Sequence, residues 1–345
     1  MTENPSSNRF LQACNQQLPE VKPVWLMRQA GRILKPYRDL KERTGSILEL
    51  FKTPDLAAEI TLMPVEMLHV DAAILFADIL TPVEPMGCEI HFKPGPVFAR
   101  PVRTRADIEA LREVRTEVDL PYVLEAIRLI RRALPPSIPL IGFGGSPFTL
   151  GTYMVEGGGS KNFTMFRRLL YADSAAAHLL LEKLTEVVID YLQAQVQTGA
   201  QAIQLFDTWI GMLSPAAFEQ IVLPYLQRIF AALEDLDVPR IYYANDACHL
   251  LALLPRVGAD ILSIDWRTDI AHAFHLYDNK ITLQGNLDPC ALFGPPEVVV
   301  EETRKIMQKT ENLPHIFNLG HGVLPDTPID NVRLLIDTVH EYTGS

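Results

Sequence analysis

Eight short apolar runs, each rich in branched or aromatic residues, recur along this 345-residue chain with helical patterns between them. Such runs are typical of parallel β-strands joined by crossover helices, because strands buried on both faces have no polar side. Eight strand-then-helix units close a (βα)8, or TIM, barrel, and this fold routinely exceeds about 250 residues as one domain. We therefore predict an α/β fold with a single (βα)8 barrel over residues 1–345. The predicted strands are Val24–Met27, Ala72–Phe76, Pro139–Phe143, Ala202–Phe206, Arg240–Tyr243, Asp260–Ile264, Ile281–Gln284 and Ile316–Leu319.

Two segments interrupt the pattern of strands and helices. Residues 1–8 are polar and are expected to be disordered. Residues 83–102 contain Gly87, the tripeptide Pro94-Gly95-Pro96 and alternating apolar residues, which together predict a β-hairpin inserted after the second strand. That hairpin is expected to form a lid or an interface.

Charge and composition exclude several classes of function. The net charge of −11 argues against an extended nucleic-acid surface, because phosphate binding needs a concentrated positive field. Apolar residues make up 48% of the chain, yet no apolar stretch is long enough to span a bilayer, and no signal-peptide pattern opens the sequence. The four cysteines form no C-x-x-C pair, so neither a disulfide framework nor a zinc ribbon is expected. A cytoplasmic protein that binds neither nucleic acid nor membranes is predicted.

Barrel enzymes build their active sites from the loops at the carboxyl ends of the strands. The residues that follow the eight runs form a polar set, of which about half would be structural caps in any barrel. These residues are Arg28, Asp78, Gly144-Gly145, Asp207-Thr208, Asn245-Asp246, Asp265, Asn286 and His321.

The turn after the first run carries two arginines, in the segment Arg28-Gln29-Ala30-Gly31-Arg32. Guanidinium groups stay charged at physiological pH and grip carboxylate or phosphate in a planar fork. Two fixed cations at a strand end therefore predict a site for a carboxylated ligand. A purely structural ion pair for either arginine is the alternative.

With this polar set assembled, the chain resembles the uroporphyrinogen decarboxylase family from Pro23 to about Thr343. The resemblance implies a cofactor-free and metal-free barrel that converts uroporphyrinogen III to coproporphyrinogen III by removing four acetate carboxyl groups as carbon dioxide. It also implies a cytoplasmic homodimer with a tetrapyrrole substrate. The motifs that carry it are residues 28–32 (RQAGR), 76–80 (FADIL), 142–150 (GFGGSPFTL), 153–157 (YMVEG), 206–209 (FDTW), 285–289 (GNLDP) and 318–322 (NLGHG).

The resemblance also implies roles for individual residues. Asp78 would bind the macrocycle centrally and stabilise its cationic intermediate, and Arg28 would assist proton delivery, although an arginine is itself a poor acid. Tyr153 and His321 would complete the catalytic set of Asp78, Arg28, Tyr153 and His321. Structural alternatives are an N-cap for Asp78 and buried packing for Tyr153. The substrate-binding set would be Arg28, Gln29, Ala30, Gly31, Arg32, Asp78, Tyr153, Thr208 and His321.

Chemical reasoning from the residues agrees with this assignment. Loss of carbon dioxide from an acetate leaves a carbanion-like centre, and a pyrrole can accept the electrons once its adjacent ring carbon is protonated. The protein then needs cations to hold carboxylates, a proton donor, and a negative charge to stabilise the cationic ring. Arg28, Arg32 and Asp78 supply the two kinds of charge, and an apolar run before Asp78 strengthens the effect of its carboxylate.

The chain departs from the family pattern at two places, and these departures leave two alternatives open. Ile33 replaces an aromatic residue, and Asn245-Asp246 stands where the family typically has a lysine-glycine pair. A tetrapyrrole-binding relative without turnover is one alternative. The other is a zinc-dependent corrinoid:thiol methyltransferase of the same superfamily, whose His-x-Cys motif is absent around Cys248.

Overall fold

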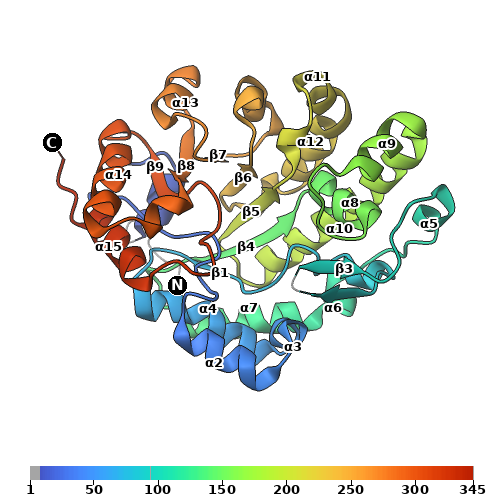
Figure 1. Cartoon of the computed structure of the whole chain (residues 1–345), viewed down its shortest axis with the longest axis horizontal. Helices are drawn as coiled ribbons and strands as arrows, with labels where there is room; N and C mark the ends of the chain where they lie inside the picture. The colour runs from blue at the N-terminus through green and yellow to red at the C-terminus, as the bar shows by residue number, and fades with distance from the viewer. Residues whose placement is uncertain (1–7, 94, 345) are drawn as a thin grey trace.

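A curled sheet of seven parallel strands forms the centre of the computed structural model, which describes residues 8–93 and 95–344 (Figure 1). Each strand pairs with the next in the order β1-β4-β5-β6-β7-β8-β9. Each also lies within or overlaps one of the predicted runs from the second to the eighth, so the parallel α/β architecture is confirmed. The strands are β1 (Ala73–Ile74), β4 (Leu140–Gly145), β5 (Ala202–Asp207), β6 (Arg240–Ala244), β7 (Ile261–Ile264), β8 (Thr282–Leu287) and β9 (His315–Leu319).

The first predicted strand, Val24–Met27, forms only a single parallel bridge, between Val24 and Phe317 of β9. The Phe317 N–H donates to the Pro23 carbonyl at 2.9 Å, and on the other side the Asp71 N–H donates to the Val24 carbonyl at 2.8 Å. The prediction of a full strand is therefore wrong in extent, because the chain turns at residues 27–28 before a ladder develops. The segment nevertheless lies between β9 and the residues that lead into β1.

A buried polar network ties this first segment to the sheet. The Trp25 indole N–H donates to Gln284 Oε1 of β8 at 2.9 Å. The Gln284 amide nitrogen in turn lies 2.9 Å from both Gln204 Oε1 of β5 and Ser263 Oγ of β7. All four side chains are fully buried, where an unmade hydrogen bond is costly. The network therefore ties the first segment to strands β5, β7 and β8.

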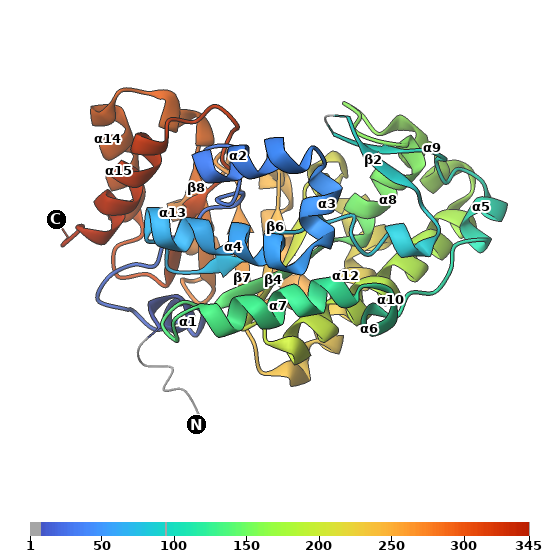
Figure 2. The ribbon, with the colours of Figure 1, turned by 90° about the horizontal axis from the view of Figure 1, so that it is seen from below.

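The helices lie outside the sheet, as Figures 1 and 2 show, and two of them, α4 and α7, pack against one another. The α-helices are α1 (Arg9–Cys14), α2 (Lys35–Thr44), α3 (Ile47–Lys52), α4 (Pro54–Leu68), α5 (Arg105–Glu109), α6 (Thr116–Asp119), α7 (Pro121–Ala133), α8 (Pro147–Glu156), α9 (Thr164–Ala172), α10 (Ser174–Thr198), α11 (Pro215–Ala217), α12 (Leu223–Ala232), α13 (Ile270–Leu276), α14 (Pro296–Lys309) and α15 (Ile329–His340). Shorter helical turns are η2 (Glu84–Met86), η3 (Ile210–Met212), η4 (Phe218–Val222), η5 (Glu234–Leu236), η6 (Cys248–Val257) and η7 (Pro289–Phe293).

The amphipathic stretch that precedes β6 is divided into α11, η4 and α12. Its turn η4 is a π-helix that ends just before Pro224, and proline has no backbone N–H to continue a regular helix. The apolar residues Phe218, Val222 and Ile229 are nonetheless buried, so this helical face packs into the core as scaffold.

The segment predicted as an inserted hairpin contains two antiparallel strands, β2 (Ile90–Phe92) and β3 (Pro96–Phe98). β3 also pairs with the chain after α8, through a bridge between Val97 and Gly158. Gly158 has φ +155°, and a Cβ there would lie 2.8 Å from the Pro96 carbonyl oxygen, so this close approach requires glycine. The hairpin is thus attached to the segment that follows α8.

Residues 1–7 of the predicted disordered segment lie outside the described residues, whereas Asn8 is buried and its side chain accepts a hydrogen bond from Leu11 N as the N-cap of α1. Disorder is therefore the wrong prediction for Asn8. No helix within residues 8–93 and 95–344 is long and apolar enough to cross a membrane.

Candidate active site

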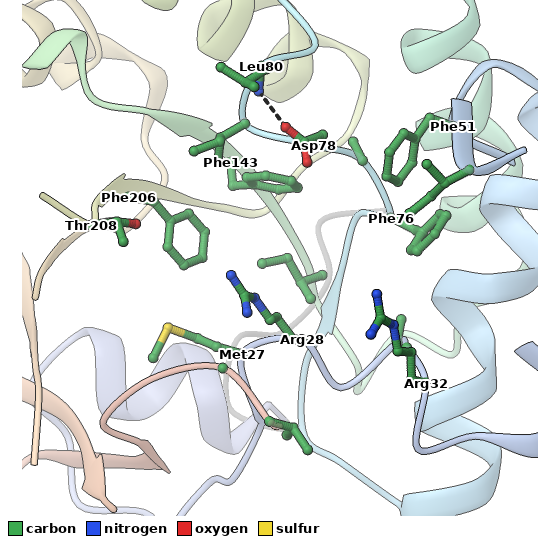
Figure 3. Close-up of a pocket in the computed structure, with 18 of the residues that line it drawn as sticks. Met27, Arg28, Arg32, Phe51, Phe76, Asp78, Leu80, Phe143, Phe206 and Thr208 are labelled. Carbon is green, nitrogen blue, oxygen red and sulfur yellow. Dashed lines mark hydrogen bonds between the residues drawn. The ribbon is translucent and has the colours of Figure 1, made fainter. Parts of the chain in front are cut away.

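A cavity of about 480 Å³ opens where the strands end, and Figure 3 shows its charged and aromatic walls. Its lining comes from segments far apart in the sequence, including the first turn, the end of β1, the β2–β3 hairpin and the loop after β9. The lining residues are Met27, Arg28, Ala30, Gly31, Arg32, Ile33, Tyr37, Ile47, Phe51, Ile74, Leu75, Phe76, Ala77, Asp78, Ile79, Leu80, Phe92, Gly95, Pro96, Phe143, Tyr153, Phe206, Thr208, Tyr243, His321, Gly322, Val323, Leu324 and Pro325.

Eight of the nine predicted site residues line this one cavity. They are Arg28, Ala30, Gly31, Arg32, Asp78, Tyr153, Thr208 and His321. The predicted hairpin also reaches it, through Phe92, Gly95 and Pro96.

Gln29 is the exception, and it takes a structural place instead of the predicted substrate-binding one. Its side chain is fully buried. Its Oε1 accepts from Leu26 N at 3.0 Å, and its Nε2 donates to the Ala72 carbonyl at 3.0 Å. With both ends of the amide bonded to the backbone, Gln29 fastens the arginine turn to the entry of β1.

Arg28 and Arg32 are the two cations of the cavity. Both are exposed, and within residues 8–93 and 95–344 neither guanidinium has an ion-pair or hydrogen-bond partner. The turn that carries them is held by Arg38, whose Nη1 donates to the Arg32 carbonyl at 2.7 Å. The structural ion pair considered from the sequence is therefore not formed, and both cations remain available to an anion.

Arg28 depends on a glycine of the loop after β9. Its backbone has φ +64°, which is uncommon for a residue with a side chain. The side chain crosses Gly322 so closely that a Cβ at that position would lie 2.6 Å from Arg28 Cγ. A Cβ at residue 322 would force the Arg28 side chain to move, because real Cβ atoms do not come so near another carbon.

We expect Gly322→Ala to displace the Arg28 side chain while the barrel stays folded. Loss of one well-placed charged contact should raise the KM for a carboxylated substrate roughly tenfold. Steady-state kinetics and circular dichroism measure the two effects. Gly294→Ala, at a site remote from the cavity, is the control, and an unchanged KM in Gly322→Ala would contradict the expectation.

Asp78 is the one acidic side chain among the described lining residues. Its Oδ1 accepts a hydrogen bond from Leu80 N at 2.9 Å, as the dashed line in Figure 3 shows. Burial raises the pKa of this carboxyl, while the Leu80 N–H and the charge of Arg28 lower it in part. The helical N-cap considered from the sequence is not formed, because the next helical turn, η2, begins after Val83. Asp78 instead closes a local turn through Leu80 N, which leaves its other carboxylate oxygen for a ligand.

His321 lies in the loop after β9 between two glycines. Its Nδ1 accepts from Gly322 N at 2.7 Å, so the neutral imidazole carries its proton on Nε2 and can donate it to an acceptor. Its pKa is lowered to about 4, first by burial and then by the charges of Arg28 and Arg267. The imidazole is therefore uncharged at neutral pH.

This lowered pKa predicts a loss of stability in acid. Because the folded pKa of about 4 lies below the ordinary value of 6.5, the unfolded chain binds the proton first. The contribution of His321 is fully present above pH 6.5 and is lost as the pH falls towards 4, by about 3 kcal/mol at most. Urea unfolding of wild type and His321→Asn across this range should show a shallower pH dependence in the variant.

His275→Asn provides the control, because His275 is exposed. Buried His315 has a pKa lowered in the same direction, so the wild type and both variants share its contribution. Equal pH slopes for wild type and His321→Asn would contradict the assignment to His321.

Tyr153 and Thr208 provide hydroxyl groups on one side of the cavity. Tyr153 extends from α8, and burial raises the pKa of its phenol, so the group remains protonated. Thr208 follows β5, and its backbone carbonyl accepts from Asn245 Nδ2 at 3.1 Å. Both residues line the cavity, so neither side chain is confined to packing in the core.

An aromatic lining is the feature that sequence reasoning missed. Phe76, Phe143, Phe206 and Tyr243 line the cavity. Phe206 packs on both Phe143 and Tyr243, with ring centroids 5.6 and 5.7 Å apart. The available signal was positional, since each of the four is the last residue of a predicted run. An aromatic wall suits a flat or cup-shaped apolar ring system.

The two departures from the family pattern have clear places in the structure. Ile33 lines the cavity as an apolar side chain. Asn245 is buried and links two strand ends, because its Nδ2 reaches the Thr208 carbonyl and its Oδ1 accepts from Tyr243 Oη at 3.1 Å. The same Tyr243 hydroxyl also reaches the Gly320 carbonyl at 3.0 Å. Asn245 thus serves as a bridge beneath the cavity.

Two further polar residues at the strand ends, Asp207 and Asn286, have structural contacts. Asp207 is fully buried and accepts hydrogen bonds from Thr149 Oγ1 at 2.7 Å and Tyr242 Oη at 2.9 Å. Burial raises its pKa to about 6. Asn286 donates to the backbone carbonyls of Asp265 and Thr268. These residues hold the loops that carry the site.

Within residues 8–93 and 95–344, no group of three or more His, Cys, Asp or Glu side chains is placed to hold a metal ion. Cys248, near the region where a zinc site was considered, is an exposed free thiol. The donor set that a zinc-dependent methyltransferase needs is therefore not assembled in this part of the chain.

Solved structures share the fold at low sequence identity. A methyltransferase from Methanosarcina mazei superposes with a TM-score of 0.82 at 23% identity, covering 96% of this chain and 97% of the other. A B12-independent methionine synthase from Shewanella sp. W3-18-1 superposes with a TM-score of 0.57 at 11% identity, covering 84% and 86%. At these identities the likeness concerns the fold alone.

Sequence relatives are much closer. Uroporphyrinogen decarboxylase from Geobacter sp. (strain M21) is 48% identical over 338 residues, which cover 98% of this chain and 99% of the relative. The protein of the same name from Syntrophotalea carbinolica is 48% identical over 342 residues, covering 99% of each. The model of the uroporphyrinogen decarboxylase (URO-D) family matches residues 5–342. The chain therefore belongs to the uroporphyrinogen decarboxylase family.

Proposed function

We propose that this chain removes the four acetate carboxyl groups of uroporphyrinogen III as carbon dioxide and releases coproporphyrinogen III. The relatives that match over nearly the whole chain carry the name of this activity. The observation that carries the proposal is the cavity itself. In it, Arg28 and Arg32, which have no partner among the described residues, and the carboxylate of Asp78 occupy an aromatic-lined space. This combination suits a ligand with an apolar ring system, N–H donors and many carboxylates.

Each group has a distinct task in this proposal. Arg28 and Arg32 bind substrate carboxylates, because a guanidinium matches a carboxylate with two parallel N–H donors. Asp78 accepts pyrrole N–H groups with the oxygen that Leu80 leaves free, and its negative charge stabilises the ring as that ring becomes cationic. Tyr153, Thr208 and His321 supply hydrogen-bond donors to the remaining carboxylates.

The chemical step proceeds through the substrate's own pyrrole. Protonation of the ring carbon next to the acetate-bearing carbon makes the ring cationic. The electron pair of the C–CO₂ bond then moves into the ring, carbon dioxide leaves, and the exocyclic carbon takes up a proton to become a methyl group. The first proton returns from the ring carbon, which restores the pyrrole. Asp78 lowers the barrier because its attraction to the ring is strongest when the ring is positive.

Arg28 assists the proton transfers by holding the acid in place. An arginine does not release its proton near neutral pH, so it orients a carboxylic acid or a water molecule that does. Neutral His321 keeps its Nε2 proton for a substrate carboxylate and adds no charge that would oppose the cationic ring.

The architecture and assembly belong to the same proposal. The first segment completes the eight strand positions of a single-domain (βα)8 barrel in this proposal. Two contacts support this count: the bridge of Val24 to β9 and the hydrogen bond from Asp71 N to the Val24 carbonyl. Family membership supports a homodimer in the cytoplasm. Light scattering on the purified protein measures the mass, and a monomer at micromolar concentration would contradict the dimer.

The test of function is anaerobic incubation of the EDTA-treated protein with uroporphyrinogen III, followed by oxidation and separation of the products by their number of carboxyl groups. Stepwise loss to the four-carboxylate product supports the proposal. Unchanged substrate despite measurable binding would identify the chain as a tetrapyrrole-binding relative without turnover.

A further inference from the structure

Trp209 is not among the residues that line the cavity, yet it packs directly behind one of them. It follows Thr208 at the end of β5 and belongs to a cluster of three rings with Tyr153 and Phe163. The Tyr153 and Trp209 rings pack edge to face with centroids 6.0 Å apart, and the Phe163 and Trp209 centroids are 4.6 Å apart. Tyr153 reaches the cavity from this cluster.

The indole nitrogen of Trp209 is one of several buried side-chain polar atoms without a hydrogen-bond partner among the described residues, and it belongs to the ring cluster that contains Tyr153. It is shielded from solvent and has no hydrogen-bond acceptor in the part of the chain that the structure describes. Trp25, by contrast, donates its indole N–H to Gln284 Oε1 at 2.9 Å. A buried N–H without an acceptor costs free energy, so such a group calls for an explanation.

The candidate acceptor in the ring cluster is the phenol oxygen of Tyr153. Burial raises the pKa of this phenol, while an interaction with the Trp209 side chain opposes the rise, as an N–H directed at the phenol oxygen would do. The two rings already pack against each other.

The backbone at Trp209 is held in place by hydrogen bonds to neighbouring buried residues. Its backbone N–H donates to Thr149 Oγ1 at 3.3 Å, and Thr149 Oγ1 donates to the buried carboxylate of Asp207 at 2.7 Å. Asn245 Nδ2 holds the preceding carbonyl, that of Thr208. These hydrogen bonds therefore restrict where the indole ring of Trp209 can lie.

We propose that Trp209 is a positioning residue that donates its indole N–H to the phenol oxygen of Tyr153 and thereby directs the phenol hydrogen into the cavity. An indole N–H can only donate, whereas a phenol can donate or accept. Once its oxygen accepts from Trp209, Tyr153 offers its own hydrogen to an acceptor. A carboxylate is such an acceptor, so Trp209 sets Tyr153 to recognise substrate carboxylates. This inference rests on the proposed function.

The kinetic test removes the N–H while keeping an aromatic ring. Trp209→Phe should lower kcat/KM for uroporphyrinogen III about tenfold, the effect of one neutral hydrogen bond at a desolvated site. Phe163→Leu disturbs the same cluster but keeps the indole, and it should lose no more than about twofold. In a Tyr153→Phe background, Trp209→Phe should cause little further loss. A further tenfold loss there would overturn the proposal.

A spectroscopic test is independent of catalysis. The chain has three tryptophans, so a ¹⁵N-labelled sample shows three indole N–H resonances, and Trp209→Phe identifies one of them. Tyr153→Phe keeps the ring but removes the oxygen, and it should move the Trp209 resonance upfield while that of Trp25 stays unchanged. An unmoved Trp209 resonance would overturn the proposal, whether or not the wild-type protein decarboxylates uroporphyrinogen III.

Discussion

Asp78→Asn is expected to remove most turnover and to leave the fold intact. The substitution keeps an oxygen that can accept from Leu80 N, so the local turn is preserved. In the proposed mechanism it removes the negative charge that stabilises the cationic ring, and loss of one such electrostatic group lowers kcat by about 10²–10³-fold. Single-turnover decarboxylation under anaerobic conditions measures this loss directly.

A matched control is available for that variant. Asp288 also accepts a hydrogen bond from the backbone N–H two residues ahead, that of Cys290 at 2.9 Å, but it does not line the cavity. Asp288→Asn should therefore keep its activity. Near-normal turnover in Asp78→Asn would remove Asp78 from the mechanism.

Arg28→Gln is expected to give the second large effect. Glutamine can take the same left-handed backbone conformation with similar strain, so the turn should survive. The substitution leaves a substrate carboxylate without its partner in a partly desolvated cavity, which should lower kcat/KM about a hundredfold. Steady-state kinetics with uroporphyrinogen III and thermal unfolding of both proteins separate lost binding from lost stability.

Arg28→Lys refines this prediction, because lysine keeps the charge but loses the planar fork. Its activity should lie between those of wild type and Arg28→Gln. Arg304→Gln, on the exposed face of α14, is the control for the loss of one positive charge. Equal activity of Arg28→Gln and wild type would show that Arg28 does not contact the substrate.

The strand pattern could be predicted because it is local. Buried parallel strands leave short apolar runs whatever their neighbours are, and seven of the eight runs contain or overlap a strand of the parallel sheet. The first run differs because its extent depends on partners far away in the sequence, Phe317 of β9 and Asp71 before β1. Such non-local hydrogen bonds cannot be predicted from the residues of the run itself.

The candidate site shows the same division between local and non-local information. Arg28, Asp78 and His321 were recognised because charged or polar residues after a buried strand stand out, and all three line the cavity. The aromatic lining was overlooked because a phenylalanine at the end of a strand looks the same whether it faces the core or a cavity. The sequence assigns no role to Trp209 beyond its motif, because its contact with Tyr153 joins helix α8 to the loop after β5.

The sequence by itself determined the parallel α/β fold and the charges that the site contains, because hydrophobic periodicity and residue type are properties of short segments. Only the tertiary structure decided which of two adjacent side chains enters the cavity and which is buried in the core. Arg28 enters the cavity while adjacent Gln29 is buried and bonded to the Ala72 carbonyl. The physical reason is that the left-handed backbone of Arg28 and the long-range hydrogen bond of Gln29 form only when the turn meets the entry of β1 and the glycine loop after β9.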